Sequence, residues 1–431
     1  MRSRTPRHGA RILAGVVSVA LAGVLSGCGS SSGSGGGAQT VRFVWWGNQD
    51  RADATKKAVA LFEKKHPDIR VQTEFSGYAA YVQKLTTQVA GGAAPDLIQL
   101  DRPTFGEYQH KHVLADLGRY TGSTLHLDKI PANLLSGGKA DGKQYAVPAG
   151  QTTQMLVYDQ KLFAKAGVTV PEDGWTWKQF TEDMRKVGAR TGVAGTTDFG
   201  WAVDWFDSWL HEHGKQLYTA DGKLGFTAGD LEQFWNATAA LRKTKGVSAP
   251  EATTKMDGST QNSALVLKQA ASEMNYDSNL TSYLSSYQGT LKAAPLPSDD
   301  PAHSGMAALP PVYFGIAQHS SHKDAAAKLL DFLVNDPEAG AAPGATRGVP
   351  ANSEVRAAVC GAATGDGKAV CDYEQRVQQR MGPSDTWQWP SGSSAIKTDF
   401  QQVYDDVIFG RTSVSAGAER VVKNAQQSLE Q

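Results

Sequence analysis

The sequence has no excess of charge of either sign and no familiar catalytic motif. Its 43 basic residues balance its 43 acidic residues, so the formal net charge at pH 7 is zero. A chain that binds nucleic acid normally carries a basic surplus, so this balance argues against a nucleic-acid partner. A Walker A motif, an HExxH motif and a plausible Ser/His/Asp set are also missing, so no motif indicates a nucleotide hydrolase, a metalloprotease or a serine hydrolase.

Long hydrophobic runs are missing as well. The apolar run from Ile12 to Leu25 has 14 residues, whereas a helix needs roughly 20 to span a bilayer. Four arginines precede this run, and it ends in Leu25-Ser26-Gly27-Cys28, which matches the lipobox of bacterial lipoproteins. We predict a cleaved signal peptide over residues 1–27 and lipidation of Cys28, with an ordinary signal peptide as the alternative. Cleavage would remove four basic and no acidic residues and bring the net charge to −4.

Cysteine is rare. Besides Cys28 the chain has only Cys360 and Cys371. We expect these two to form a disulfide, because they are an even pair in an exported chain. The short loop that they close would stabilise the fold by about 3 kcal/mol on the chain-entropy estimate. A metal site is less favoured, because two thiols without a nearby histidine do not complete the four ligands of structural zinc.

The rest of the chain predicts a tether followed by a two-lobed α/β protein. Residues 28–40 are rich in glycine and serine and should form a flexible tether with an average reach of about 20 Å. The remaining roughly 400 residues exceed what one core usually supports, which predicts two lobes. Their opening alternates strand and helix periodicity, typical of βαβ units. The predicted elements are strands at 41–46, 69–75 and 95–101, and helices at 56–66, 78–89, 326–333 and 418–429.

An ordered series of motifs resembles the extracellular solute-binding lipoproteins of ABC importers, in the carbohydrate-binding branch similar to maltodextrin-binding proteins. The series reads FVWWG, AVALFEKKHPDIRV, APDLIQLD, GKQYAVP, MLVYDQKLFAKAGV, PEDGWTWKQF, HKDAAAKLLDFLVNDPEA and RGVPANSEV, in this order. The resemblance implies a type II periplasmic-binding-protein-like fold, with two α/β lobes joined by a hinge of three crossings and ligand held between them. It sets lobe 1 at residues 40–148 plus 298–345 and lobe 2 at residues 149–297 plus 346–431.

The end of the first predicted strand is where we expect a ligand. Ligands collect at the carboxyl ends of parallel strands, and Trp45 and Trp46 lie at such an end. Successive side chains of a strand face opposite ways, so one indole should lie in the core and the other toward the cleft, for which we favour Trp46. An indole offers a flat apolar surface to the C–H face of a sugar ring, while amides and carboxylates bond its hydroxyls.

Further aromatic and polar residues near the expected strand ends and crossings complete the predicted site. The tryptophans of WAVDWFDSW, Trp201 and Trp205, are expected to share one helical face. Trp175 and Trp177 are expected in the core. The candidate ligand-binding residues are Trp46, Asn48, Gln49, Asp101, Arg102, Gln151, Thr152, Trp201, Asp204, Trp205, Asn275, Asp277, Asn279, Tyr313, Trp387 and Trp389.

Two other groups of residues have types that occur in metal or catalytic sites. The pairs His110/His112 and His211/His213 have metal-ligand residue types, but residues two apart on a helix do not face each other, so we expect no metal and no cofactor. Pairs of aspartates, such as Asp204 and Asp207 or Asp299 and Asp300, contain the carboxyl groups of a glycosidase. A glycosidase also needs those groups to be held across a substrate with one pKa raised, and nothing in the sequence indicates this.

The sequence therefore predicts a membrane-anchored, non-enzymatic substrate-binding protein of an ABC transporter. Its expected partners are a mono- or oligosaccharide and the transporter's permease, and it is expected to be a monomer that is lipid-anchored on the outer face of the cell membrane. The alternatives are an extracytoplasmic carbohydrate-active enzyme and the same fold binding a non-sugar solute.

Overall fold

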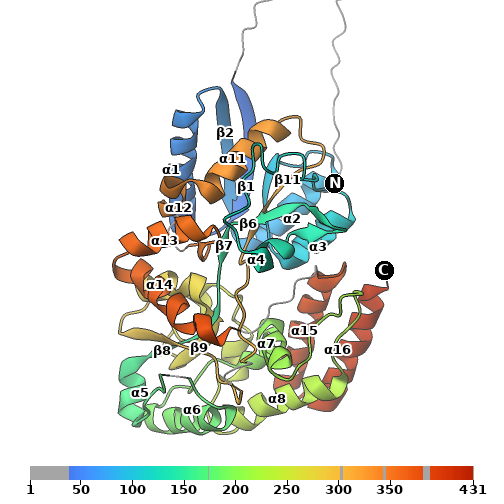
Figure 1. Ribbon diagram of the computed structural model, residues 1–431. Helices are drawn as coiled ribbons and strands as arrows, with labels where there is room; N and C mark the ends of the chain where they lie inside the picture. Colours follow the sequence, from blue (N-terminus) through green and yellow to red (C-terminus); the bar gives the residue numbers. More distant parts are fainter. Residues whose placement is uncertain (1–37, 173, 301–303, 343–345, 382–388, 431) are drawn as a thin grey trace, which may run out of the picture. The chain divides into compact units, whose positions relative to one another are not determined.

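The computed structural model describes residues 38–172, 174–300, 304–342, 346–381 and 389–430. The predicted signal peptide, Cys28, the tether up to residue 37 and Trp387 lie outside these ranges. The elements that follow form two α/β lobes (Figure 1).

The first lobe contains a five-stranded sheet in the order β2-β1-β3-β11-β6 (Figure 1). Strand β1 is parallel to β2 and β3, whereas β11 is antiparallel to β3 and β6. The predicted opening βαβ units and their parallel strands are confirmed. The bounds are Gln39–Trp46 for β1, Ile69–Ser76 for β2, Leu97–Leu100 for β3, Ala146–Pro148 for β6 and Tyr313–Ile316 for β11.

Helices cover both faces of this sheet, because β1 directs alternate side chains to opposite sides. Phe43 and Trp45 pack in one apolar cluster with residues of α1, α11 and α12. Val44 packs in another with residues of α2 and α3. The bounds are Gln49–Lys65 for α1, Tyr78–Ala90 for α2, Arg102–His110 for α3, Ala132–Ser136 for α4, Lys323–Asn335 for α11 and Pro337–Ala341 for α12.

Helix α1 begins at Gln49, before the predicted start at Lys56. The Oδ1 atom of Asn48 accepts a hydrogen bond from the backbone N–H of Arg51 at 3.0 Å and so caps the first turn. Gln49 and Asp50 are exposed, which removes the apolar pattern that marks the later turns. The predicted start was wrong because the capped first turn is polar.

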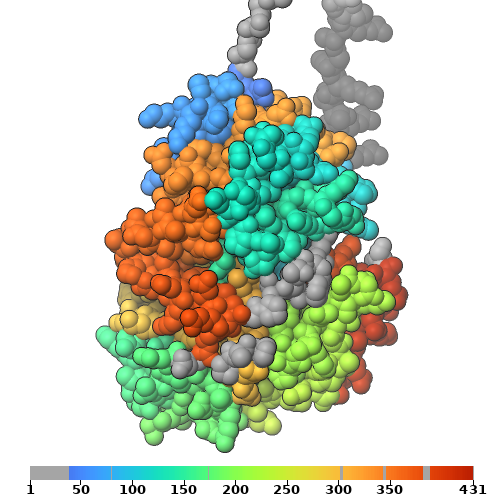
Figure 2. All heavy atoms as spheres, in the orientation of Figure 1, coloured from blue at the N-terminus to red at the C-terminus, as the bar shows by residue number. Residues whose placement is uncertain are grey.

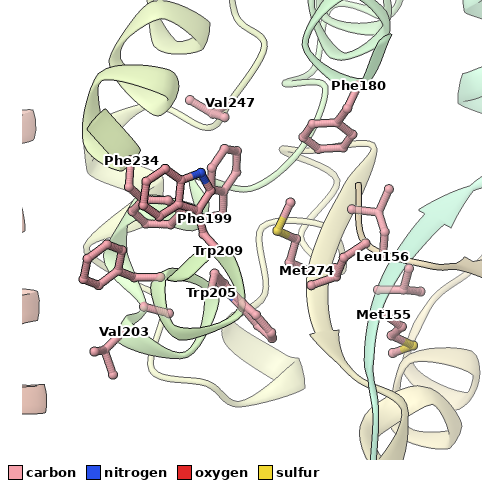
Figure 3. Packing of buried hydrophobic residues seen from close by; sticks show 14 of the residues in the cluster. Met155, Leu156, Phe180, Phe199, Val203, Trp205, Trp209, Phe234, Val247 and Met274 are labelled. Carbon is pink, nitrogen blue, oxygen red and sulfur yellow. The ribbon is translucent and has the colours of Figure 1, made fainter. Parts of the chain in front are cut away.

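The second lobe contains a three-stranded sheet in the order β10-β8-β9, with both pairings antiparallel. Its core is rich in aromatic residues, including Phe199, Trp205, Trp209 and Phe234 (Figure 3). The strand bounds are Gln154–Asp159 for β8, Ser272–Tyr276 for β9 and Leu291–Ala294 for β10. The main helices are α5 Gln160–Ala166, α6 Trp177–Thr191, α7 Val203–Glu212, α8 Ala228–Arg242, α10 Leu280–Ser286, α14 Gly365–Val377, α15 Ser393–Ile408 and α16 Val414–Leu429, with the short turns η1 Phe199–Trp201 and η3 Asp277–Asn279.

The prediction that Trp201 and Trp205 share a helical face was wrong. Trp201 ends the short turn η1, and Trp205 lies in the first turn of α7. Ala202 between them is extended, with φ −109° and ψ 123°. This break in the helical path removes the four-residue spacing on which the prediction depended.

Three chain segments lie beside one another between the lobes. Strand β7 (Gly150–Gln151) pairs antiparallel with β12 (Val349–Pro350). The backbone N–H of Thr152 donates to the carbonyl of Leu309 at 2.8 Å, and the N–H of Leu309 donates to the carbonyl of Thr152 at 2.9 Å. The three segments are therefore joined by backbone hydrogen bonds.

Helices α13 (Ser353–Ala362) and α14 form a surface that contacts both lobes (Figure 2). Helix α13 packs against α12, while α14 packs against α10, and a disulfide with an S–S distance of 2.02 Å joins Cys360 to Cys371. Ala351 belongs to the apolar cluster of the first lobe. Helix α13 therefore contacts the first lobe through α12 and also packs against α14; the lobe limits at residues 345 and 346 stay a prediction.

Candidate ligand-binding site

The two indoles at the end of β1 have different surroundings. Trp45 is fully buried and packs against Phe43 and Phe75, with ring centroids 4.8 and 6.1 Å away. Trp46 is half-buried and lies 5.6 Å from the ring of Tyr78 in an edge-on arrangement. Strand alternation thus sends Trp45 into the sheet core and leaves part of Trp46 accessible.

Asp101 ends the loop after β3 and caps α3. Its Oδ1 atom accepts a hydrogen bond from the backbone N–H of Thr104 at 3.0 Å, and its Oδ2 atom accepts one from the hydroxyl of Tyr78 at 2.6 Å. Asp101 is half-buried and Tyr78 is 47% exposed. The first lobe therefore presents an oriented carboxylate beside two accessible aromatic rings.

A matching group lies on the second lobe. Asp204, in the first turn of α7, accepts a hydrogen bond from the hydroxyl of Tyr276 at 3.1 Å. Its other oxygen lies 3.4 Å from Nζ of Lys397 on α15. The ring of Trp205 packs 5.3 Å from that of Tyr276. A carboxylate, a cation and two aromatic rings are thus brought together from three separate segments.

The two groups influence each other across the lobes. The negative charge of Asp204, followed by that of Asp101, raises the pKa of Lys397 against its partial burial. The guanidinium of Arg102 lies 4.6 Å from the ring centroid of Trp389, which is a cation–π contact between the lobes. Helices α3 and α15 are neighbours. We define the candidate site as Trp46, Tyr78, Asp101, Arg102, Asp204, Trp205, Tyr276, Trp389 and Lys397.

Several predicted site residues instead hold the crossing segments. The Nε2 atom of Gln151 donates to Glu374 at 2.9 Å, and the Oε1 atom of Gln151 accepts from Arg356 at 2.7 Å. The hydroxyl of Thr152 donates to Oδ1 of Asp277 at 2.6 Å, and both residues are buried. These side chains supply hydrogen-bond partners to one another at the buried crossing. An unpaired polar group buried there would cost free energy of folding.

The remaining predicted residues are separate from this cluster. Asn275 donates to the hydroxyl of Tyr283 at 2.7 Å and accepts from Asn279 at 2.8 Å. Tyr313 is fully buried beside Phe105, with ring centroids 5.7 Å apart. The side chains of Asn48 and Gln49 hydrogen-bond within α1, and Trp201 is half-buried against the second core.

Three members of the cluster were missed from the sequence. Tyr78 begins α2 directly after β2, so its place at a strand end was an available signal. Tyr276 lies between the predicted residues Asn275 and Asp277, so an aromatic ring beside two polar candidates was an available signal. No sequence pattern indicates Lys397, because its place in the cluster depends on the packing of α15 beside α7.

The described ranges of the chain contain neither a metal-ligand cluster nor a membrane-spanning helix. No group of three or more His, Cys, Asp or Glu side chains gathers there in a way that suits a metal ion. Within the same ranges, no helix combines the length and apolar character needed to cross a membrane.

The model of the bacterial extracellular solute-binding protein family matches residues 46–340, which is more than half of the chain. The chain belongs to this family. The matched range includes β2, β3, β6 and β11 of the first lobe, β8 to β10 of the second lobe, and Asp101, Asp204 and Tyr276 of the candidate site.

Curated relatives align with part of this solute-binding protein. An uncharacterised lipoprotein of Streptomyces antibioticus is 29% identical over 177 residues, covering 40% of this chain and 39% of that protein. The melibiose/raffinose/stachyose-binding protein of Bacillus subtilis is 28% identical over 166 residues, covering 38% and 37%. The alignments therefore span about two fifths of each relative's length.

A solved structure aligns with about nine tenths of the chain. The family 1 extracellular solute-binding protein of Alicyclobacillus acidocaldarius has a TM-score of 0.69 and 29% identity, and the alignment covers 91% of this chain and 98% of that one. The fold is thus a type II periplasmic-binding-protein fold, as the resemblance implied.

Proposed function

We propose that this solute-binding protein captures a mono- or oligosaccharide between its lobes and delivers it unchanged to the permease of an ABC importer. A lipid on Cys28 would hold it at the outer face of the cell membrane. The observation that supports the proposal most strongly is the meeting of aromatic rings and two tyrosine-bonded carboxylates, Asp101 and Asp204, from opposite lobes.

This combination suits a sugar. Trp46 and Tyr78 offer accessible ring surface to the C–H groups of a pyranose. Asp101 and Asp204 are acceptors for sugar hydroxyls in charge-assisted bonds. Because the two carboxylates belong to different lobes, a ligand that bonds both binds the closed arrangement more tightly than an open one, and this difference drives closure.

Two alternative functions would also use the carboxylates of the candidate site. An extracytoplasmic carbohydrate-active enzyme would use the same carboxylates on a bound sugar. A solute-binding protein for a cationic or peptide ligand would use them as counter-charges.

A thermal-shift screen of sugars, polyamines, peptides and metal ions separates these possibilities. We expect one sugar or a related set to raise the Tm saturably. Mass spectrometry after long incubation should then find the sugar intact. Cleavage of the sugar would favour the enzyme, and stabilisation by amines or peptides alone would refute the carbohydrate proposal.

A further inference from the structure

A cavity of about 30 Å³ lies in the first lobe, in a place that the candidate site does not use. Its walls include Phe43, Ala58, Phe314, Val334 and Ala339, all of them apolar, and the guanidinium-bearing Arg347. No member of the candidate site lines it. The cavity thus combines apolar walls with one cationic side chain.

Arg347 is held rigidly at this cavity. Its Nε atom donates to Oε1 of Gln99 at 2.9 Å, and its Nη2 atom donates to the hydroxyl of Thr55 at 2.9 Å. The guanidinium carbon lies 5.7 Å from the ring centroid of Phe314. Thr55 and Phe314 also line the cavity, so the bonded guanidinium lies at its wall.

The positive charge there is not offset by the described protein groups. Arg347 is only 7% exposed, and burial, followed by the charge of nearby Arg51, lowers its pKa well below the ordinary value of an arginine. Arg51 donates to the carbonyls of Trp46 and Thr346, and burial lowers its pKa to about 10. Both residues bond neutral acceptors, and among the described residues neither forms an ion pair with a carboxylate.

Buried charges in proteins are normally paired, because an isolated buried ion is strongly disfavoured. A volume of about 30 Å³ holds roughly two water molecules, which is enough for a monatomic anion and too little for an organic acid. We propose that this cavity binds a small inorganic anion such as chloride against the guanidinium of Arg347.

The anion would stabilise the third crossing. Gly348 and Pro350, on either side of Val349 in β12, line the same cavity. An anion at Arg347 therefore fixes the start of the segment that pairs with β7. Its effect should appear in the stability of the whole protein, independently of any sugar.

The first experiment compares thermal unfolding in sodium chloride with unfolding in sodium gluconate at equal ionic strength. Gluconate is too large for the cavity, and the equal ionic strength matches the general effects of salt. Any difference between the two salts therefore reports on binding of chloride. We expect chloride at tenfold excess over its Kd to raise the Tm by about 2 °C relative to gluconate. In crystals grown in bromide, an anomalous peak should lie in the cavity beside the guanidinium of Arg347.

Two variants and one control test the location. Arg347→Gln removes the cation, and Ala58→Val fills the cavity while keeping Arg347, so both should lose the chloride-specific shift. Arg411→Gln removes an exposed arginine that pairs with Asp406 and should keep the shift. Equal Tm values in chloride and gluconate for the unmodified protein, or an undiminished chloride shift in both cavity variants, would overturn the proposal.

Discussion

Trp45 and Trp46 are identical neighbours whose roles differ because a strand turns successive side chains to opposite faces. The same division between structural and accessible groups holds in the second lobe. Trp205 is only 7% exposed and belongs to the core, so its loss would be a stability defect of about 3 to 5 kcal/mol. Asp204 beside it remains accessible enough to meet Lys397. A binding test should therefore use Trp46 in preference to Trp205.

Replacing Trp46 by Ala should weaken sugar binding about tenfold or more, because the largest accessible ring of the first lobe would be lost. The matched control is Trp177→Ala, since Trp177 is also half-buried and its Nε1 donates to Glu212 at 2.7 Å within the second lobe. Calorimetric titration measures the affinity, and urea unfolding measures the stability. Equal losses of affinity in the two variants would show that stacking on Trp46 is not involved.

At the scale of elements, helix starts determine where the polar side chains lie. Asp101 both caps α3 and accepts from Tyr78, so the geometry of a helix terminus orients a carboxylate of the candidate site. Asn48 uses its side chain for the cap alone. An aspartate at such a position has a second carboxylate oxygen that the cap does not use, whereas the single side-chain oxygen of an asparagine is occupied by the cap.

The disulfide between α13 and α14 is a further element-scale feature. Its Cys360 and Cys371 are 11 residues apart, and the chain-entropy estimate for so short a loop is about 3 kcal/mol. We expect the double variant Cys360→Ser/Cys371→Ser to lose about this much free energy of unfolding, as measured by urea titration. Reducing agent should lower the stability of the unmodified protein and leave the variant unchanged; a variant as stable as the oxidised protein would contradict this.

At the scale of the whole molecule, the first crossing, at residues 151–153, meets two buried carboxyl groups. Asp277 accepts from Thr152 and from the backbone N–H of Thr153, and Glu374 accepts from Thr153 and Gln151. Burial, then the negative charge of Glu374, raises the pKa of Asp277 well above 3.8. Tyr373 lies near the same pair, and its pKa is raised by burial and by both carboxyls.

The folded protein therefore prefers Asp277 protonated. Its contribution to stability is full below the ordinary pKa of 3.8 and falls as the pH rises through the higher folded pKa, because the folded state then binds more protons than the unfolded state. Asp277→Asn keeps a neutral donor and should remove this decline, so the variant should gain stability relative to the unmodified protein as the pH increases. Urea unfolding between pH 4 and 8 tests this; parallel pH profiles would refute it.

Much of the architecture could be predicted from local sequence. Alternating apolar residues indicated β1, β2 and the parallel start of the sheet, and the ordered motifs indicated the two-lobed fold. Part of the candidate site could also be predicted from the sequence, because Trp46, Asp101 and Asp204 lie at strand or helix ends. Gln151, Thr152 and Asp277 were also predicted to bind the ligand; in the structure Thr152 bonds Asp277, and Gln151 bonds Glu374.

The sequence by itself determined which segments become strands and helices, because periodicity, caps and β-branched runs act over a few residues. It also supplied the two cysteines that meet in the disulfide. Only the tertiary structure decided that Lys397 faces Asp204, that Trp389 lies under Arg102, and that Arg347 is buried at a cavity. Those relations join residues far apart in the chain, and they arise from how whole helices pack, which no local pattern records.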